Sequence, residues 1–207
     1  MTDFVHLHLH TEYSLLDGAC RIADMMEYAK SLGQRSVAIT DHGVMYGVVE
    51  FYNAAKSAGL HPVIGCEVYL APGSRLERDR EAGNPMHLVL LAETQEGYQN
   101  LMALVSAGFV DGFYFKPRID LDILRSHAKG LIACSACLSG PLSRAILQND
   151  LDRARQMALT LSEIFGEDNF FVELQDHGMR VEPEVNRALR QLAGELGLPM
   201  VVTNDVH

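Results

Sequence analysis

Short apolar runs alternate with stretches of helical periodicity along this chain. The apolar runs predict seven strands, at Phe4–Leu9, Ser36–Thr40, Pro62–Leu70, His87–Ala92, Leu131–Ser135, Phe170–Leu174 and Met200–Thr203. The helical stretches are Ile22–Leu32, Val48–Ala58, Thr94–Ala107, Pro141–Leu147, Leu151–Phe165 and Pro183–Leu196, and a polar, charged loop occupies Gly73–Asn84. Such alternation indicates an α/β fold with parallel strands and right-handed crossovers. No repeat or linker divides the chain, so we expect one domain over residues 1–207.

The positions of the polar residues favour a closed barrel over an open doubly wound sheet. Metal-binding residue types lie at or just past the carboxyl ends of strands, at His8, His10, Asp41, His42, Glu67, Cys137, Asp205 and His207. In a closed parallel barrel these ends ring one mouth. In an open sheet they are spread along a line, and only those near the switch point converge. The pattern therefore predicts a TIM-like barrel with a polar site at its C-terminal mouth.

Three histidines share one face of the first predicted strand. His6, His8 and His10 alternate with leucines, and a strand has a period of two, so the imidazoles point the same way. Imidazoles on a core-facing strand are costly unless they are paired or bind a metal. The alternative is an exposed edge strand with a chance histidine cluster.

Two further stretches place a carboxylate beside an imidazole directly after a strand. Asp41 and His42 follow the second predicted strand, and Asp205 and His207 follow the last. Such pairs suit metal binding, or a histidine held in one tautomer by its neighbour. For Asp41 the alternative is an N-cap of the following helix.

Single polar residues in apolar strands are weaker signals. Glu67 lies in an otherwise apolar strand and needs a buried partner, either a metal or an arginine. His87 opens a strand and taken alone is an ordinary strand-start histidine. Cys134 and Cys137 form one CxxC without a second pair, which is a weak zinc-finger signal.

Composition narrows the classes of function. The chain has 207 residues, 48% of them hydrophobic and 21% charged, and a formal net charge of −10. This charge argues against a broad, sequence-independent DNA-binding surface, although a small site for a strand end is compatible with it. No apolar run is long enough to span a membrane and the N-terminus lacks a signal peptide, so we expect a cytoplasmic location.

The motifs together resemble the PHP (polymerase and histidinol phosphatase) family. The matching stretches are HLHLHTEYSLLDG, TDHG, GCE, His87, CLSG and DVH, in the family's order and strand context. The further stretches VEFYNAAKSAGLHPVIGCE, GYQNLMALVS, KPRID, CSACLSG and VELQDHG are similar to the polymerase branch, the bacterial DNA polymerase III alpha subunits. The resemblance covers essentially the whole chain.

The resemblance implies a distorted seven-stranded (β/α)7 barrel that holds two or three divalent metal ions, with zinc, manganese and iron as candidates. Nine positions carry over as ligands: His8, His10, Asp17, His42, Glu67, His87, Cys137, Asp205 and His207. Through the metals, His10, Glu67 and Asp205 would be catalytic in hydrolysis of phosphodiesters by a metal-bound hydroxide.

The polymerase branch also implies a substrate and partners. The expected substrate is a DNA 3′ end, cut by 3′–5′ exonuclease (proofreading) activity. Lys116 and Arg118 are candidates to bind neighbouring phosphates, with structural packing as their alternative role. Glu173 and His177 are candidate supporting or substrate groups near the mouth. We expect an N-terminal fragment of a longer chain, with polymerase domains downstream and other replisome subunits as partners.

Two rival functions are compatible with the same candidate ligands. The first is a non-catalytic module, stabilised by metal, that supports the polymerase and docks partners. The second is a small-molecule phosphatase of the histidinol phosphatase type, which shares the ligands. Polymerisation itself is not expected, because neither a glycine-rich phosphate loop nor the paired aspartates of a polymerase palm occur.

Overall fold

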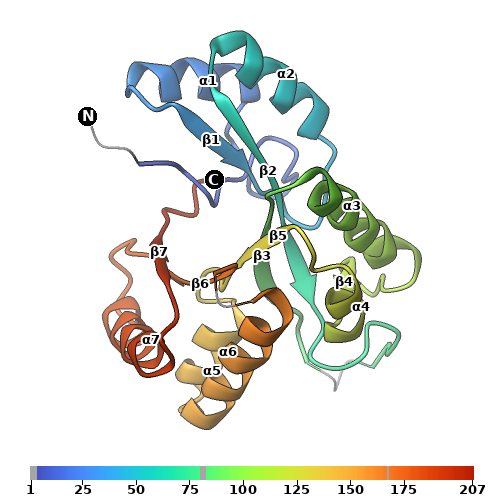
Figure 1. Ribbon diagram of the computed structural model, residues 1–207, viewed down its shortest axis with the longest axis vertical. Coiled ribbons are helices and arrows are strands. Elements are labelled where there is room, and N and C mark those ends of the chain that lie inside the picture. The colour runs from blue at the N-terminus through green and yellow to red at the C-terminus, as the bar shows by residue number, and fades with distance from the viewer. Residues whose placement is uncertain (1–3, 80–82, 167) are drawn as a thin grey trace.

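The computed structural model describes residues 4–79, 83–166 and 168–207. Within these ranges seven strands form one curled sheet (Figure 1). They are β1 (Ser36–Ile39), β2 (His61–Leu70), β3 (Met86–Ala92), β4 (Arg118–Ile119), β5 (Leu131–Cys134), β6 (Phe170–Leu174) and β7 (Met200–Val202). The strand order is β1-β2-β3-β5-β6-β7, and β4 pairs with β2.

Helices cover the outside of the sheet. They are α1 (Ile22–Ser31), α2 (Val48–Ala58), α3 (Gln95–Val110), α4 (Leu121–Ser126), α5 (Pro141–Leu147), α6 (Leu151–Phe165) and α7 (Glu182–Leu196). Helix α2 packs on β1 and β2, α3 on β3 and β4, and α7 on β6. In the described ranges, no helix has both the length and the apolar character needed to cross a bilayer. The main apolar core lies between the sheet and helices α3 to α7, and a second core lies between α1, α2 and β1.

One strand runs against the others, so the expectation of an all-parallel sheet is wrong. Strand β3 pairs antiparallel with both β2 and β5, whereas the other pairs are parallel. The connection from β2 to β3 contains no helix in its described part, and an antiparallel return needs no crossover helix. As a consequence, the start of β3 lies beside the carboxyl end of β2, and His87 pairs with Tyr69.

The first expected strand, Phe4–Leu9, is not a strand of the sheet. Its backbone instead makes isolated hydrogen bonds on both sides. Ala38 N of β1 donates to His6 O, and His10 N donates to Val206 O near the end of the chain. The named strands therefore form an open half-barrel, and this segment joins β1 to the segment after β7 (Figure 1).

The remaining differences are short elements and boundaries. Strand β4 and helix α4, which follow α3, were not predicted. Residues 80–82 of the expected loop Gly73–Asn84 lie outside the described ranges. The six other strands and all six predicted helices are present. Cys134 is buried at the end of β5, as its strand assignment predicts.

Candidate metal centre

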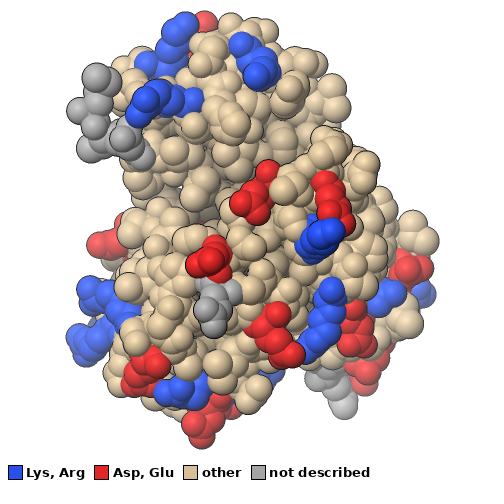
Figure 2. All heavy atoms as spheres, in the orientation of Figure 1, with Lys and Arg blue, Asp and Glu red and all other residues tan. Residues whose placement is uncertain are grey.

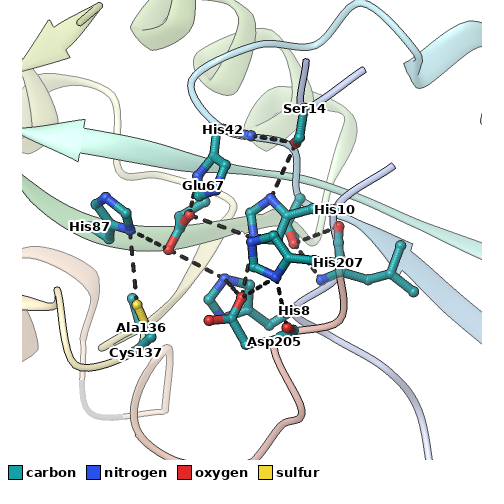
Figure 3. A network of polar contacts seen from close by, with 12 residues as sticks. His8, His10, Ser14, His42, Glu67, His87, Ala136, Cys137, Asp205 and His207 are labelled. Atoms are coloured by element: carbon teal, nitrogen blue, oxygen red, sulfur yellow. Dashed lines mark hydrogen bonds and ion pairs between the residues drawn. The ribbon is translucent and has the colours of Figure 1, made fainter. Parts of the chain in front are cut away.

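Nine side chains gather at the edge of the sheet where the parallel strands end and β3 begins, and all of them except Asp17 are labelled in Figure 3. We call them the mouth cluster: His8, His10, Asp17, His42, Glu67, His87, Cys137, Asp205 and His207. Each one contacts at least one other member within 4.0 Å. The structure thus brings together all nine positions expected as ligands. Because β3 is antiparallel, even His87 at a strand start lies in this group.

Glu67 lies at the centre of the mouth cluster and is almost fully buried. Its Oε1 lies 3.3 Å from His8 Nε2 and 2.9 Å from His87 Nδ1. Its Oε2 lies 3.6 Å from His10 Nε2 and 2.5 Å from His42 Nδ1. Burial raises the pKa of Glu67, but the surrounding imidazoles outweigh burial and hold this pKa well below its usual range. Each carboxylate oxygen therefore faces a different pair of imidazoles.

The described residues contain three overlapping sets of possible ligands, and within each set the ligand atoms lie within 4.8 Å of one another. They are His10, His42 and His207; His8, His10 and Glu67; and His42, Glu67 and His87. Asp205 Oδ1 adds a carboxylate oxygen between His8 Nε2 (3.1 Å) and His10 Nε2 (3.2 Å). Shared histidines and a shared carboxylate are what a centre for more than one ion needs.

Asp17 and Cys137 lie at opposite margins of the cluster. Asp17 Oδ2 is 3.3 Å from His42 Nε2. Asp17 precedes Gly18 in a tight turn that only glycine fits, because a Cβ at position 18 would lie 1.9 Å from Thr11 O. Cys137 Sγ is 3.9 Å from His87 Nδ1. Burial raises the pKa of the Cys137 thiol to about 12, so it stays neutral until a cation binds beside it.

Glu173 orients His8 from behind. His8 Nδ1 donates to Glu173 Oε1 at 2.7 Å, and the other carboxylate oxygen accepts from Ala136 N at 3.0 Å. The Nε2 atom of His8 then points at the carboxylates of Glu67 and Asp205. Burial lowers the pKa of His8, but Glu173 and Glu67 outweigh it and raise the pKa well above its usual value. Nε2 therefore holds either a second proton or a metal ion.

Asp41 provides a second support for the cluster. Its role is neither metal binding nor capping of the following helix, the roles expected from the sequence. Asp41 is buried and accepts from Thr11 N (2.6 Å), Thr11 Oγ1 (2.8 Å) and Ser14 Oγ (2.8 Å). Ser14 Oγ lies 3.3 Å from His10 Nδ1. Asp41 is not the N-cap of α2, which is Gly47. Its carboxylate instead fixes the loop that carries His10.

His177 is bound outside the cluster. Its Nδ1 pairs with Glu182 Oε1 at 2.8 Å, and its Nε2 donates to Asn204 O at 2.8 Å. It thereby ties the segment after β6 to the segment that carries Asp205. His6 makes an edge contact with Phe4 and no contact with the mouth cluster.

The two expected phosphate-binding residues differ in their surroundings. Arg118 is 3% exposed, and its guanidinium donates to the carbonyls of Gly112 (3.0 Å), Arg75 (2.9 Å) and Glu77 (2.7 Å). Its structural role is therefore evident. Lys116 instead lies with Nζ 5.1 Å from the centre of the Tyr69 ring, beside the mouth.

Five buried atoms of the cluster make close ion-pair contacts with one another but no hydrogen bond of good geometry. They are His8 Nε2, His10 Nε2, His42 Nδ1, Glu67 Oε2 and Asp205 Oδ1. An unsatisfied buried polar atom costs about 1–3 kcal/mol, and these five face one another. Divalent ions satisfy such a set, and mixed imidazole and carboxylate donors suit zinc, manganese or iron. The residues therefore fit a metal centre.

Two of the four described non-glycine residues with positive φ lie at the same edge. Ala136 (φ 61°) and Asp205 (φ 45°) adopt left-handed conformations that non-glycine residues rarely occupy. Both are next to or within the mouth cluster. Such strain is typical of functional sites, where the surrounding structure holds a side chain in position.

Comparisons with known proteins identify the family of the chain. Residues 6–177 match the family model described as PHP domain. The chain is 46% identical to the DNA polymerase III subunit alpha of Treponema pallidum over 206 residues, and 46% identical to that of Deinococcus radiodurans over 213 residues. In both cases 99% of this chain is covered, but only 18% and 16% of the relative.

Two solved structures have a similar fold. An amidohydrolase from Chromobacterium violaceum matches with a TM-score of 0.60 at 15% identity, covering 98% of this chain and 87% of its own. A protein described as a metal-dependent phosphoesterase from Bifidobacterium adolescentis matches with a TM-score of 0.56 at 16% identity, covering 98% and 86%. At these identities the likeness concerns the fold alone.

Proposed function

The chain belongs to the PHP domain family, and we propose that it hydrolyses phosphodiesters with two or three divalent metal ions bound by the mouth cluster. The observation that carries the proposal is the set of five buried ligand atoms that face one another without a hydrogen bond of good geometry. Divalent ions satisfy these atoms with neutral imidazoles, whereas protons alone would leave three charged imidazoles in the cluster. Nine metal-competent side chains in one place support a working centre rather than a relic.

We assign the ligands as His8, His10, Asp17, His42, Glu67, His87, Cys137, Asp205 and His207. The bound ions lower the pKa of water towards neutrality and balance the charge that develops on phosphate. The metal is zinc, manganese or iron.

The residues of the chain position this chemistry. Glu67 is shared between two sets of ligand atoms and so sets their spacing. Glu173 holds His8 in the tautomer that directs Nε2 to the centre. His10 and Asp205 contribute next to each other, with Nε2 and Oδ1 3.2 Å apart. These three central groups, Glu67, His10 and Asp205, act through the metals.

We further propose that the substrate is a DNA 3′ end and that the activity is 3′–5′ exonucleolytic. Similarity to DNA polymerase III alpha subunits over 99% of the chain supports this assignment. On the face drawn in Figure 2, basic and acidic side chains of the described residues are interspersed, which suits a small end-binding site better than a duplex-binding surface.

The same similarity supports a proposal for the chain's wider setting. We propose that residues 1–207 form one PHP domain with a distorted TIM-like barrel, within a cytoplasmic DNA polymerase III alpha subunit. Its partners are then the polymerase domains of the same chain and other replisome subunits.

Two alternatives are separated by one experiment. The test follows a 5′-labelled single-stranded oligonucleotide and histidinol phosphate in parallel, before and after chelation and metal restoration. We expect progressive shortening of the oligonucleotide from its 3′ end, lost with chelator and restored by metal. A chain that binds metal but hydrolyses neither substrate is a structural module, and one that hydrolyses only the monoester is a small-molecule phosphatase.

A further inference from the structure

A cavity of about 510 Å³ opens beside the mouth cluster. Its wall includes His87, a member of the cluster, and Tyr69, whose ring lies 5.2 Å from the His87 ring. The cavity is therefore continuous with the proposed metal centre. Its size falls in the range of small-ligand pockets, roughly 300–1,000 Å³, so it suits a single nucleotide rather than a duplex.

The cavity is lined by cations although the chain is acidic. Among the described residues, Lys116, Arg118 and Arg144 line it with one carboxylate, Asp79, while the whole chain carries −10. Arg118 already donates from Nε and Nη2 to three backbone carbonyls. Arg144 makes one backbone bond, to Asn84 O at 2.9 Å. Lys116 and Arg144 are thus the cations best placed to meet an anionic ligand.

The rim of the cavity carries an exposed ring on a strained backbone. Phe115 is 66% exposed, has φ 59° and contacts the Tyr114 ring edge to face at 4.6 Å. A glycine would adopt this φ without strain, so the phenylalanine is kept at a conformational cost. The exposed part of its ring, together with Tyr114, gives the cavity an aromatic surface on which a ligand can stack.

We propose that this cavity binds the 3′-terminal nucleotide of single-stranded DNA. Its base stacks on Phe115 and Tyr114, and its phosphate lies toward the mouth cluster, with Lys116 and Arg144 balancing its charge. This subsite rests on the proposed function and specifies its substrate. Because every base has a π-face, binding is tolerant of sequence. A terminal base that is paired in a duplex cannot enter.

The first test measures binding without turnover. Thymidine 5′-monophosphate and inorganic phosphate are titrated into the metal-loaded chain by calorimetry, with wild type and the Phe115→Gly variant. We expect wild type to bind the nucleotide roughly tenfold or more tightly than phosphate. Phe115→Gly should lose that preference while its thermal midpoint stays equal or rises, because glycine relieves the strained φ.

Matched controls separate the subsite from general effects. Phe113→Ala removes another exposed ring, one outside the cavity lining, and should keep the nucleotide preference. Lys116→Ala should weaken nucleotide and phosphate alike, whereas Lys129→Ala, 80% exposed and paired with Glu96, should weaken neither.

The second test is hydrolysis of two oligonucleotides that differ only in the 3′-terminal base, which is thymine in one and absent in the other. Wild type should prefer the intact oligonucleotide in kcat/KM, and Phe115→Gly should narrow that ratio towards one. Equal binding of nucleotide and phosphate by wild type would overturn the subsite even if hydrolysis is present. Nucleotide binding as expected without any hydrolysis would instead overturn the proposed function and leave the subsite.

Discussion

Two regions of this molecule bury charged side chains in opposite ways. In the flank network beside β4, made of Arg75, Arg118 and Asp120, Arg118 donates to three carbonyls and Asp120 accepts from Arg75 and from Ile123 N. Within the described residues, only Arg75 Nε of this network lacks a partner. In the mouth cluster, five ligand atoms contact one another but lack a hydrogen bond of good geometry.

The difference separates charges that complete the fold from charges that await a ligand. Buried charge is tolerated when its hydrogen bonds are satisfied. The flank network meets this condition with atoms of the chain itself, so its residues hold a loop to β4. The mouth cluster does not, so it meets the condition only with protons or metal ions. Substitutions in the two regions should therefore affect different measurements.

The largest effect should come from Glu67→Gln. The amide preserves shape but removes the charge shared by two sets of ligand atoms. We expect hydrolysis to fall by about 10³-fold or more, since a metal centre contributes several kcal/mol to such reactions. The rate is measured on labelled oligonucleotide, with the exposed Glu163→Gln as control. Wild-type rates in Glu67→Gln would remove the mouth cluster from the chemistry.

A substitution in the flank network should move stability instead. Arg118→Met removes the guanidinium donors to three carbonyls, one buried and two partly buried, and we expect a loss of about 2–4 kcal/mol in the free energy of unfolding. Metal content should not change. Urea unfolding measures the loss, and Arg155→Met, which breaks an exposed pair with Glu195, should cost less than about 1 kcal/mol. Loss of metal from Arg118→Met would contradict the separate roles assigned to the two regions.

Glu173→Gln tests the layer between fold and site. Because Glu173 fixes the tautomer of His8, its amide should lower metal affinity by roughly 10–100-fold without abolishing binding. Competition with a chelator of known affinity measures the change, and nitrogen-15 NMR reports the tautomer. An unchanged affinity together with an unchanged tautomer would show that His8 is oriented by other contacts.

The smallest effect is a pH dependence that should be specific to the metal-free chain. The pKa of His8 is raised by Glu173 and Glu67 against burial, and the pKa of His42 is raised mainly by Glu67 against burial. A histidine whose pKa is raised on folding stabilises the fold at low pH, and this stabilisation is lost as pH rises through the folded value. Thermal midpoints of the metal-free chain should therefore fall above about pH 6.5.

The metal-loaded chain should behave differently, because metal ions compete with protons and bind neutral imidazole. Its midpoint should hold or rise over the same pH interval. Parallel thermal scans with and without metal make the comparison, and identical pH profiles would contradict the idea that protons replace metal in the mouth cluster.

Sequence periodicity predicted most elements because their apolar faces are long enough to be read. Strand β4 has two residues and helix α4 six, too short for either period. The direction of β3 was missed, although one signal was available. His87 stands at a strand start while the other expected ligands follow strand ends, and only an antiparallel strand places its start at the mouth.

The candidate ligands were predictable because motif spacing and strand position both mark them. The residues that support these ligands were less predictable. Glu173 contacts His8 across 165 residues of chain, and Asp41 holds Ser14 across 27. Such contacts depend on how the sheet curls, which no local pattern encodes. For Arg118, the sequence indicated a cation near the mouth, but only the fold reveals that carbonyls occupy its donors.

The metal content of the purified chain tests the central claim most directly. The chain is stripped with chelator, reloaded with zinc, manganese or iron, freed of loose ions and measured by mass spectrometry, beside Glu67→Gln. We expect two or three tightly held ions per wild-type chain and at least one fewer in Glu67→Gln. Wild-type protein that retains no ion from any of the three metals would contradict the account. The five ligand atoms of the mouth cluster that lack a hydrogen bond of good geometry would then be satisfied by protons alone.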